Sequence, residues 1–176
     1  MKIGITGHSR GLGLALANKL SANNQIIGFS RSNGYNIAHV HEIIKDALDC
    51  DMFINNAYNN YYQSDLLLYL FRLWQDNPNK SIVNIGSTVT TYPRIETEID
   101  HLPWAYRDHK IALERLFRHL VKQTHKCHML LVAPGAIDTD MIAHHNGIKA
   151  SADQVADIII DAISKPLIKE ITIYEQ

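Results

Sequence analysis

The stretch Thr6-Gly-His-Ser-Arg-Gly-Leu-Gly13 joins two segments with different hydrophobic periodicity. The run before it, Lys2-Ile-Gly-Ile-Thr6, is typical of a short buried strand. After it, Leu12, Leu16 and Leu20 recur at helical spacing. A chain that passes from a strand through glycines into a helix leaves the N–H groups of the first helical turn without partners. Those groups can hold a phosphate.

The three glycines of this turn predict the dinucleotide-binding turn of a Rossmann fold. Gly7 would permit the tight turn, Gly11 would let the backbone approach a pyrophosphate, and Gly13 would let the helix pack closely on the strand. The predicted phosphate-binding residues are Gly7, Ser9, Arg10, Gly11, Leu12 and Gly13. Because glycine-rich turns also occur in ordinary loops, the rest of the chain has to decide.

Length and composition predict one globular domain over residues 1–176. The apolar share of 46% and the charged share of 20% are ordinary, and the net charge of −1 gives no basic surface for nucleic acid or an anionic membrane. Two cysteines, Cys50 and Cys127, are too few for a disulfide scaffold and fit a reducing compartment. With neither a secretory signal nor a membrane-spanning run expected, we predict a cytoplasmic protein.

The ten histidines do not form a recognised metal-binding pattern. The closest pairs, His39 with His41 and His144 with His145, lack i, i+4 spacing. No cysteine or carboxylate cluster accompanies them at zinc-site spacing. We therefore predict no metal site.

Strand and helix patterns alternate along the chain, which predicts βαβ units and a parallel sheet. The expected strands are Lys2–Thr6, Gln25–Ser30, a brief one near Tyr35–Ile37, Asp51–Asn55, Ser81–Gly86, His128–Ala133 and Ile171–Tyr174. Helices are expected from Leu12 to Leu20, from Val40 to Leu48, from Ser64 to Gln75, around Ala112–Leu120, and from a capping box at Ser151 through Ile163. The predicted fold class is α/β, a doubly wound, mostly parallel sheet (Rossmann fold) of about seven strands with helices on both faces.

Four further motifs follow the glycine turn in order. Asn55-Asn-Ala57 ends a strand, Ser87 follows the next strand, Tyr106-Arg-Asp-His-Lys110 is Y-x-x-x-K, and Pro134-Gly-Ala-Ile-Asp-Thr139 is P-G-x-x-x-T. Together with T-G-x-x-x-G-x-G they resemble the short-chain dehydrogenase/reductase family over nearly the whole chain. None of these motifs is specific alone, so the resemblance depends on their occurring together and in order.

The resemblance implies a catalytic set of Ser87, Tyr106, Lys110 and an asparagine, for which we select Asn60 with Asn59 as its competitor. Tyr106 would move a proton on or off the substrate oxygen, although an unperturbed phenol titrates near pH 10. The ammonium of Lys110, four residues on along a helix, would favour the phenolate. Ser87 would donate a hydrogen bond to the substrate oxygen.

The end of the second strand predicts the choice of nucleotide. NAD enzymes place an acid there, whereas this chain has Phe29-Ser-Arg-Ser32. Arg31 could pair with a 2′-phosphate, assisted by Ser30 or Ser32, and Arg10 is a second cation. We therefore expect NADP(H), with NAD(H) as the weaker candidate.

The remaining cofactor contacts follow from the resemblance. The adenine would lie against Asn36 and Ile37, the adenosine side against Asn55, Asn56 and Ala57, and the nicotinamide end against Pro134, Gly135, Ile137 and Thr139. Lys110, together with Tyr106, would also bind the nicotinamide ribose.

The chain also departs from the family pattern. Tyr58 replaces a usual glycine, Ser87 and Tyr106 are farther apart than usual, and little room for a substrate-covering loop remains between Met141 and Ser151. The leading hypothesis is an NADP-dependent oxidoreductase that acts on a small carbonyl or alcohol substrate, as a homodimer or homotetramer. The alternative is a non-catalytic NADP-binding sensor or assembly module. In a third possibility, a partner subunit or the segment from Thr88 to Ala105 completes the pocket.

Overall fold

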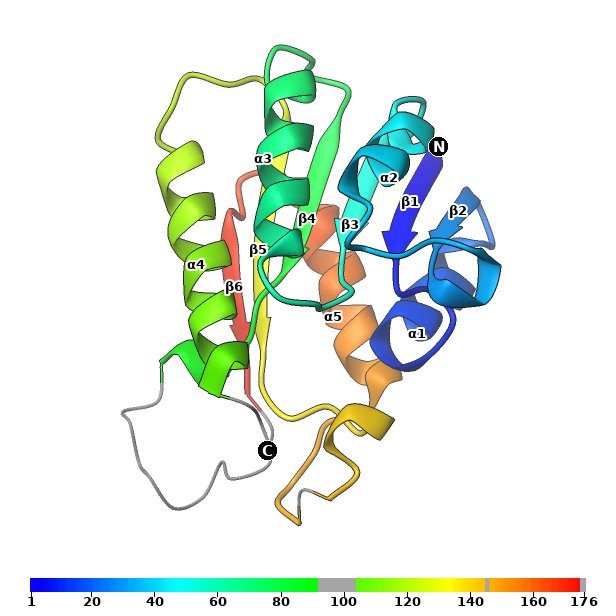
Figure 1. Ribbon diagram of the computed structural model, residues 1–176, viewed down its shortest axis with the longest axis vertical. Helices are drawn as coiled ribbons and strands as arrows, with labels where there is room; N and C mark the ends of the chain where they lie inside the picture. Colours follow the sequence, from blue (N-terminus) through cyan, green and yellow to red (C-terminus); the bar gives the residue numbers. More distant parts are fainter. Residues whose placement is uncertain (92–103, 145, 175–176) are drawn as a thin grey trace.

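A six-stranded parallel sheet forms the centre of the protein in a computed structural model that describes residues 1–91, 104–144 and 146–174 (Figure 1). From one edge to the other the strands are β2 (Gln25–Phe29), β1 (Lys2–Thr6), β3 (Met52–Asn55), β4 (Ser81–Ile85), β5 (His128–Pro134) and β6 (Glu170–Ile173). The order reverses between β1 and β3, so the sheet is doubly wound. The predicted Rossmann architecture is confirmed.

Helices cover both faces of this sheet. One face carries α1 (Gly11–Leu20) and α5 (Ala152–Ile163), and the other carries α2 (Val40–Ala47), α3 (Tyr62–Trp74) and α4 (Trp104–Leu120). Successive strand residues point to opposite faces, so Phe53 packs with α2, α3 and α4, whereas Ile54 packs with α1 and α5. This is why the strands read as continuous apolar runs rather than as alternating ones.

The capping box predicted at the start of the last helix is confirmed. The Ser151 hydroxyl accepts a hydrogen bond from the Gln154 N–H at 3.1 Å, and the Gln154 side chain accepts one from the Ser151 N–H at 3.1 Å. These bonds satisfy two donors that the first helical turn would otherwise leave free.

The strand predicted near Tyr35–Ile37 is wrong, and the sheet has six strands rather than about seven. After β2 the chain enters a 3₁₀ turn, η1 (Arg31–Asn33), and Gly34 then adopts a left-handed conformation with φ +91°. The Tyr35 ring packs edge-on against Phe29, with ring centroids 4.9 Å apart, and its hydroxyl donates to Asp46 at 2.8 Å. The segment therefore folds back over the end of β2 instead of extending beside it.

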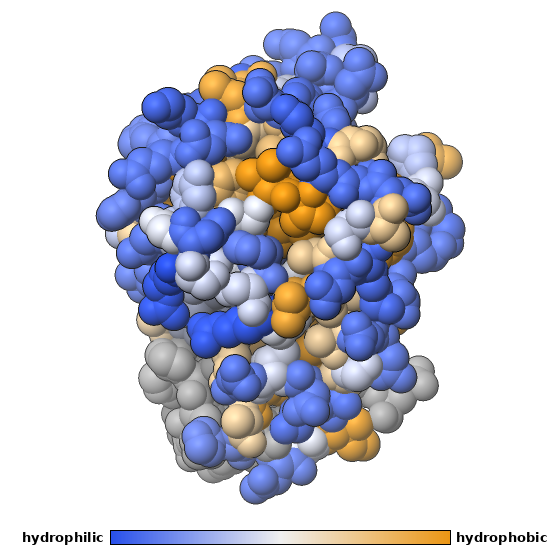
Figure 2. Space-filling view, turned by 90° about the vertical axis from the view of Figure 1, so that its right-hand side faces the viewer, coloured by the Kyte–Doolittle hydropathy of each residue, from blue (hydrophilic) through white to orange (hydrophobic). Residues whose placement is uncertain are grey.

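The side of the molecule at which β2 lies is mostly hydrophilic, with a small apolar area between the polar side chains (Figure 2). Within the described residues, no helix is both long and apolar enough to cross a bilayer. The same part of the chain contains no group of three histidine, cysteine or acidic side chains placed to hold a metal ion.

Candidate active site

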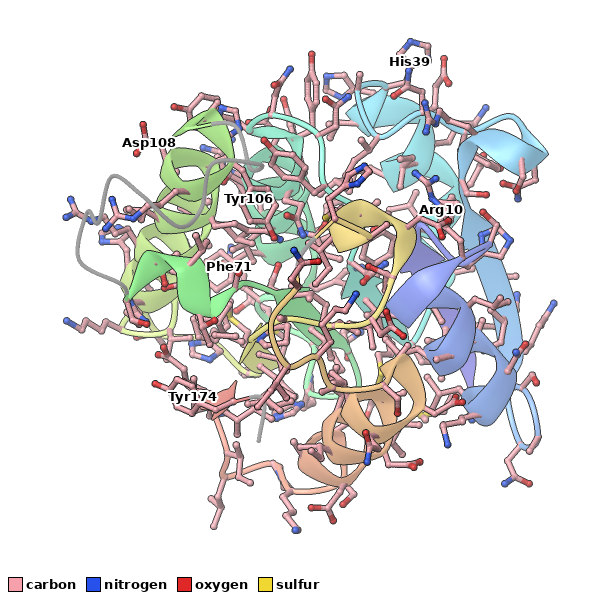
Figure 3. The ribbon with its side chains drawn as sticks, turned by 90° about the horizontal axis from the view of Figure 1, so that it is seen from below. Arg10, His39, Phe71, Tyr106, Asp108 and Tyr174 are labelled. Carbon is pink, nitrogen blue, oxygen red and sulfur yellow. The ribbon has the colours of Figure 1, made fainter. Side chains whose placement is uncertain are left out.

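The predicted motifs meet at the carboxyl edge of the sheet, onto which Figure 3 looks. The glycine turn follows β1, Asn56 and Ala57 follow β3, and Ser87 follows β4. Because all the strands are parallel, their carboxyl ends lie together although the motifs are far apart in sequence. Much of the segment from Thr88 to Ala105, which in the third possibility could complete the pocket in place of a partner subunit, lies outside the described residues.

The glycine turn has the geometry that a phosphate-binding turn needs. Gly7 and Gly11 have φ values of +70° and +52°, which side-chain-bearing residues rarely adopt. A Cβ on Gly13 would lie 2.2 Å from the carbonyl oxygen of Gly7, so only glycine lets α1 approach the turn this closely. At the helix start, Arg10 makes no side-chain capping bond, and the first turn holds no acidic residue. The amides of this first turn, which have no acceptor within the helix, therefore fit an anionic pyrophosphate.

Three hydrogen bonds between the end of β1 and the residues after β3 fix the position of this turn. The Thr6 hydroxyl accepts from the N–H groups of Asn56 and Ala57 at 2.8 and 2.9 Å. In return, the Asn56 side-chain amide donates to the Thr6 carbonyl at 2.9 Å. These bonds give the two loops one fixed arrangement.

A cavity of about 580 Å³ opens beside the glycine turn. Its wall includes the following predicted cofactor residues: Gly7, Arg10, Gly11, Leu12, Ser30, Arg31, Asn36, Ile37, Asn56, Ala57 and Thr139. It also includes residues that sequence reasoning missed: Phe29, Tyr35, Asp138, Asp140 and Met141. The volume falls within the range of small-molecule and cofactor sites.

Other predicted cofactor residues are not part of this wall: Ser9, Gly13, Ser32, Asn55, Pro134, Gly135 and Ile137. Asn55 is fully buried behind it, and its amide donates to the Gln63 carbonyl at 2.8 Å and to the Asn84 side-chain oxygen at 3.0 Å. Ser32 lies beside the cavity, with its hydroxyl oxygen 2.7 Å from that of Ser30. Asn55 therefore links β3 to α3 and β4 rather than lining the cavity.

At the β2 end of the cavity the wall carries cations and hydroxyls. Arg31 and Arg10 are both exposed and both line the cavity. Asn33 fixes the turn that presents Arg31, because its amide donates to the Gly28 carbonyl at 2.7 Å and its side-chain oxygen accepts from the Ser30 N–H at 2.9 Å. Residues 29–33 contain no carboxylate to repel a phosphate.

Lys110 lies deep beneath this edge, only 2% exposed. Its ammonium donates to the Gln63 side-chain oxygen at 2.8 Å and to the Ile85 carbonyl at 2.7 Å. Burial lowers the pKa of Lys110 to about 7, against the opposing effect of the negative charge on Glu114. The ammonium nitrogen lies 5.6 Å from the ring centroid of Tyr106, so the predicted pair is side by side.

Burial has the largest effect on the pKa of Tyr106. It raises the pKa of Tyr106 to about 12, and hydrogen bonding with Ser87 only partly offsets the effect. This is opposite to the lowering expected from Lys110. The reason is that a dry site disfavours the phenolate, whereas a buried lysine with a pKa near 7 carries only part of its charge at neutral pH.

Tyr58 separates the cavity from the Tyr106–Lys110 pair. It lines the cavity, whereas Tyr106, Lys110 and Ser87 are not among the wall residues. Its ring meets that of Tyr106 edge-on, with centroids 4.6 Å apart, and its hydroxyl oxygen is 2.9 Å from Nδ1 of His109. The side chain that replaces the family's usual glycine thus stands between the predicted cofactor and the predicted reacting groups.

The structure does not bring Asn60 to these groups. Asn60 is exposed in the loop before α3 with φ +46°, and its competitor Asn59 lines the cavity. Gln63, in the first turn of α3, contacts Lys110 instead, and its amide also donates to the Asn55 carbonyl at 2.9 Å. Sequence reasoning missed it by considering only asparagines, although a polar residue among the apolar positions of this helix was a visible signal.

Replacing Gln63 with leucine is expected to reduce the free energy of unfolding by about 1.5–3 kcal/mol. The substitution keeps the bulk but leaves the buried ammonium of Lys110 with one of its two hydrogen-bond acceptors. Urea unfolding, with Gln123→Leu at an exposed glutamine as the control, measures the difference. Equal stability of the two variants would contradict the assigned role.

The sequence matches no protein-family model and no curated protein, whereas its structure is similar to many solved structures. One is the 3-alpha-hydroxysteroid dehydrogenase from a Pseudomonas species, solved with NADH (TM-score 0.74, 19% identity, covering 99% of this chain and 94% of that chain). A second is a short-chain dehydrogenase from Burkholderia cenocepacia, solved with NADP (TM-score 0.74, 19% identity, 99% and 87%). A third is the 3-ketoacyl-(acyl-carrier-protein) reductase from Brucella melitensis, solved with NADH (TM-score 0.74, 16% identity, 98% and 96%). The chain therefore has the fold of the short-chain dehydrogenases/reductases.

Proposed function

We propose that this protein is a short-chain dehydrogenase/reductase that uses NADP(H) to interconvert a small carbonyl compound and its alcohol. The observation that carries the proposal is one sheet edge holding both a glycine-lined cavity and, beside it, the half-buried Tyr106 next to the buried Lys110. The similar structures solved with NADH and with NADP support a nicotinamide cofactor without favouring either form.

Each polar group at this edge has a role in the proposed reaction. The bound nicotinamide would supply or accept the hydride. Tyr106 donates a proton to the carbonyl oxygen, and Ser87 orients that oxygen by a hydrogen bond. A pKa of about 12 keeps the phenol protonated before nucleotide binds but makes it a weak acid, so proton donation depends on positive charge near the phenolate that forms.

Lys110 stabilises the phenolate that remains once Tyr106 has given up its proton, because an ammonium 5.6 Å from the ring is an opposite charge. For the ribose of the cofactor to reach Lys110, the ring of Tyr58 has to leave its place against Tyr106. We propose that this displacement accompanies nucleotide binding.

Replacing Arg31 with alanine tests the choice of NADP(H). A 2′-phosphate held by a guanidinium forms charge-assisted bonds, so we expect the Kd for NADPH to rise about 10–100-fold. The Kd for NADH should change by less than about twofold, since that nucleotide offers only a hydroxyl. Nucleotide fluorescence titrations with both forms measure the effect, and Arg72→Ala, at an exposed arginine of α3, is the control. An equal rise in the Kd values for NADPH and NADH would show that Arg31 does not recognise the 2′-phosphate.

The second candidate function is a nucleotide-binding module without turnover. The position of Tyr58 favours it, because its ring separates the cavity from Tyr106 and Lys110. Such a module would bind NADPH and respond to it in assembly or regulation, and no carbonyl substrate would be reduced.

A further inference from the structure

Glu114 is a buried carboxylate in the middle of α4, one helical turn after Lys110. It is 3% exposed, although glutamate is almost never fully buried unless it has partners. The proposed reaction assigns no role to Glu114, but the contacts of its side chain indicate one.

The carboxylate of Glu114 contacts Thr90, outside its own helix, and Arg118, within that helix. The Thr90 hydroxyl oxygen lies 3.0 Å from each of its oxygens. Arg118 donates to it from one turn further along α4 at 3.3 Å, and Arg118 also forms an ion pair with Glu170 of β6. Gly86 makes room for it, because a Cβ on Gly86 would lie only 3.0 Å from Oε1.

Through Thr90 the carboxylate reaches the turn that carries Ser87. The Thr90 hydroxyl is also 3.0 Å from the carbonyl oxygen of Ser87, and Ser87 caps the short turn η2 (Thr88–Thr90) by accepting from the Val89 N–H at 3.3 Å. At the other side of this turn, Arg107 of α4 donates to the Val89 carbonyl at 3.2 Å. The helix that bears Tyr106 and Lys110 therefore holds the Ser87 turn at two points.

Charge links Glu114 to Lys110 as well. The groups that face Lys110 are the rings of Tyr58 and Tyr106, the side-chain amide of Gln63 and the negative charge of Glu114. The groups that face Glu114 besides Lys110 are the hydroxyl of Thr90, the backbone of Ser87, and the charges on Arg118 and Glu170. Of these, Glu114 raises the pKa of Lys110, while burial lowers it.

We propose that Glu114 is a positioning residue that fixes the Ser87 turn against α4 and places a negative charge one helical turn after Lys110. The identity of Ser87 and Lys110 as reacting groups rests on the proposed function, whereas the contacts of Glu114 do not. Asp108 gives a matched comparison, because it is an exposed acid on the same helix, two residues before Lys110, and lies at the outer surface in Figure 3.

The first test is an NMR titration of lysine Cε and Hε signals, with Lys110 assigned by its absence in Lys110→Met. In Glu114→Gln, which keeps the size and one acceptor oxygen, the midpoint for Lys110 should fall by about one pH unit, a tenfold loss of proton affinity. Asp108→Asn should leave it in place. If the titration midpoint of Lys110 did not change in a folded Glu114→Gln protein, the electrostatic effect of Glu114 on Lys110 would be refuted. This titration needs no turnover, so it remains decisive if the proposed function fails.

The second test uses Thr90→Val, which removes the bridging hydroxyl and keeps the charge of Glu114, and which also serves if Glu114→Gln does not fold. We expect kcat for carbonyl reduction to fall about tenfold because Ser87 is displaced, with the Kd for NADPH unchanged. The Lys110 midpoint should stay within about 0.3 pH units of that of the wild type. An unchanged kcat would overturn the positioning of Ser87, and absence of turnover in the wild type would instead contradict the proposed function.

Discussion

Tyr106→Phe is expected to lower kcat for carbonyl reduction by about 10²–10⁴-fold, the range in which a positioned proton donor contributes. The substitution keeps the ring that packs edge-on against Tyr58 and removes only the hydroxyl. Because the residues that line the cavity are unchanged and only one hydroxyl is lost, the Kd for NADPH should stay within about twofold of the wild-type value. Single-turnover rates with a panel of small aldehydes and ketones, together with fluorescence titration of NADPH, measure both quantities.

Tyr69→Phe is the control for this variant, since Tyr69 is a partly buried tyrosine of α3 whose ring contacts His41 and lies outside the site. If Tyr106→Phe retained the wild-type rate, another group would be the proton donor. Tyr58 would then be the first to examine, because its ring is next to that of Tyr106. If neither the wild type nor the variant turned over any carbonyl although NADPH bound tightly, the binding-module hypothesis would be the better account.

Local sequence pattern was sufficient to predict most of the fold. The apolar runs at Ile3–Ile5 and Ile82–Val83 are strands because the central strands of a parallel sheet covered on both faces are buried on both sides. The capping box at Ser151 needs only residues three apart in sequence, so it too was readable. Where the controlling contacts were local, prediction and structure agree.

Predictions failed or were incomplete where contacts outside the local repeat of a strand or helix decide the outcome. The segment at Tyr35 is not a strand, because its hydroxyl binds Asp46 and its ring packs on Phe29. Gln63 meets Lys110 from 47 residues away, which no local spacing reveals. The sequence showed that Tyr58 was an unusual residue, but it could not show that its ring would lie against Tyr106.

Gly13→Ala is expected to destabilise the protein by about 2 kcal/mol or more and to abolish measurable NADPH binding. Inside a helix, alanine normally raises the free energy of unfolding by about 1 kcal/mol relative to glycine. At this position we expect the steric clash to outweigh that gain, so the substitution destabilises the protein. The new Cβ would lie 2.2 Å from the Gly7 carbonyl oxygen and 2.8 Å from the Asn56 side-chain nitrogen. Neither atom can give way easily, because one is backbone and the other is bonded to the Thr6 carbonyl at 2.9 Å. Relief of the clash therefore has to move α1 away from the turn, which withdraws the amides that would hold the pyrophosphate.

Asn18→Ala, at an exposed position of the same helix, separates this effect from helix propensity and should slightly stabilise the protein. Urea unfolding and NADPH titration of both variants measure stability and binding independently. Loss of binding with full stability would mean that α1 moves without loosening the core formed by Leu16 and its neighbours. Wild-type stability together with wild-type binding in Gly13→Ala would refute the close packing of α1 on Gly7, and with it the phosphate-binding role assigned to this turn.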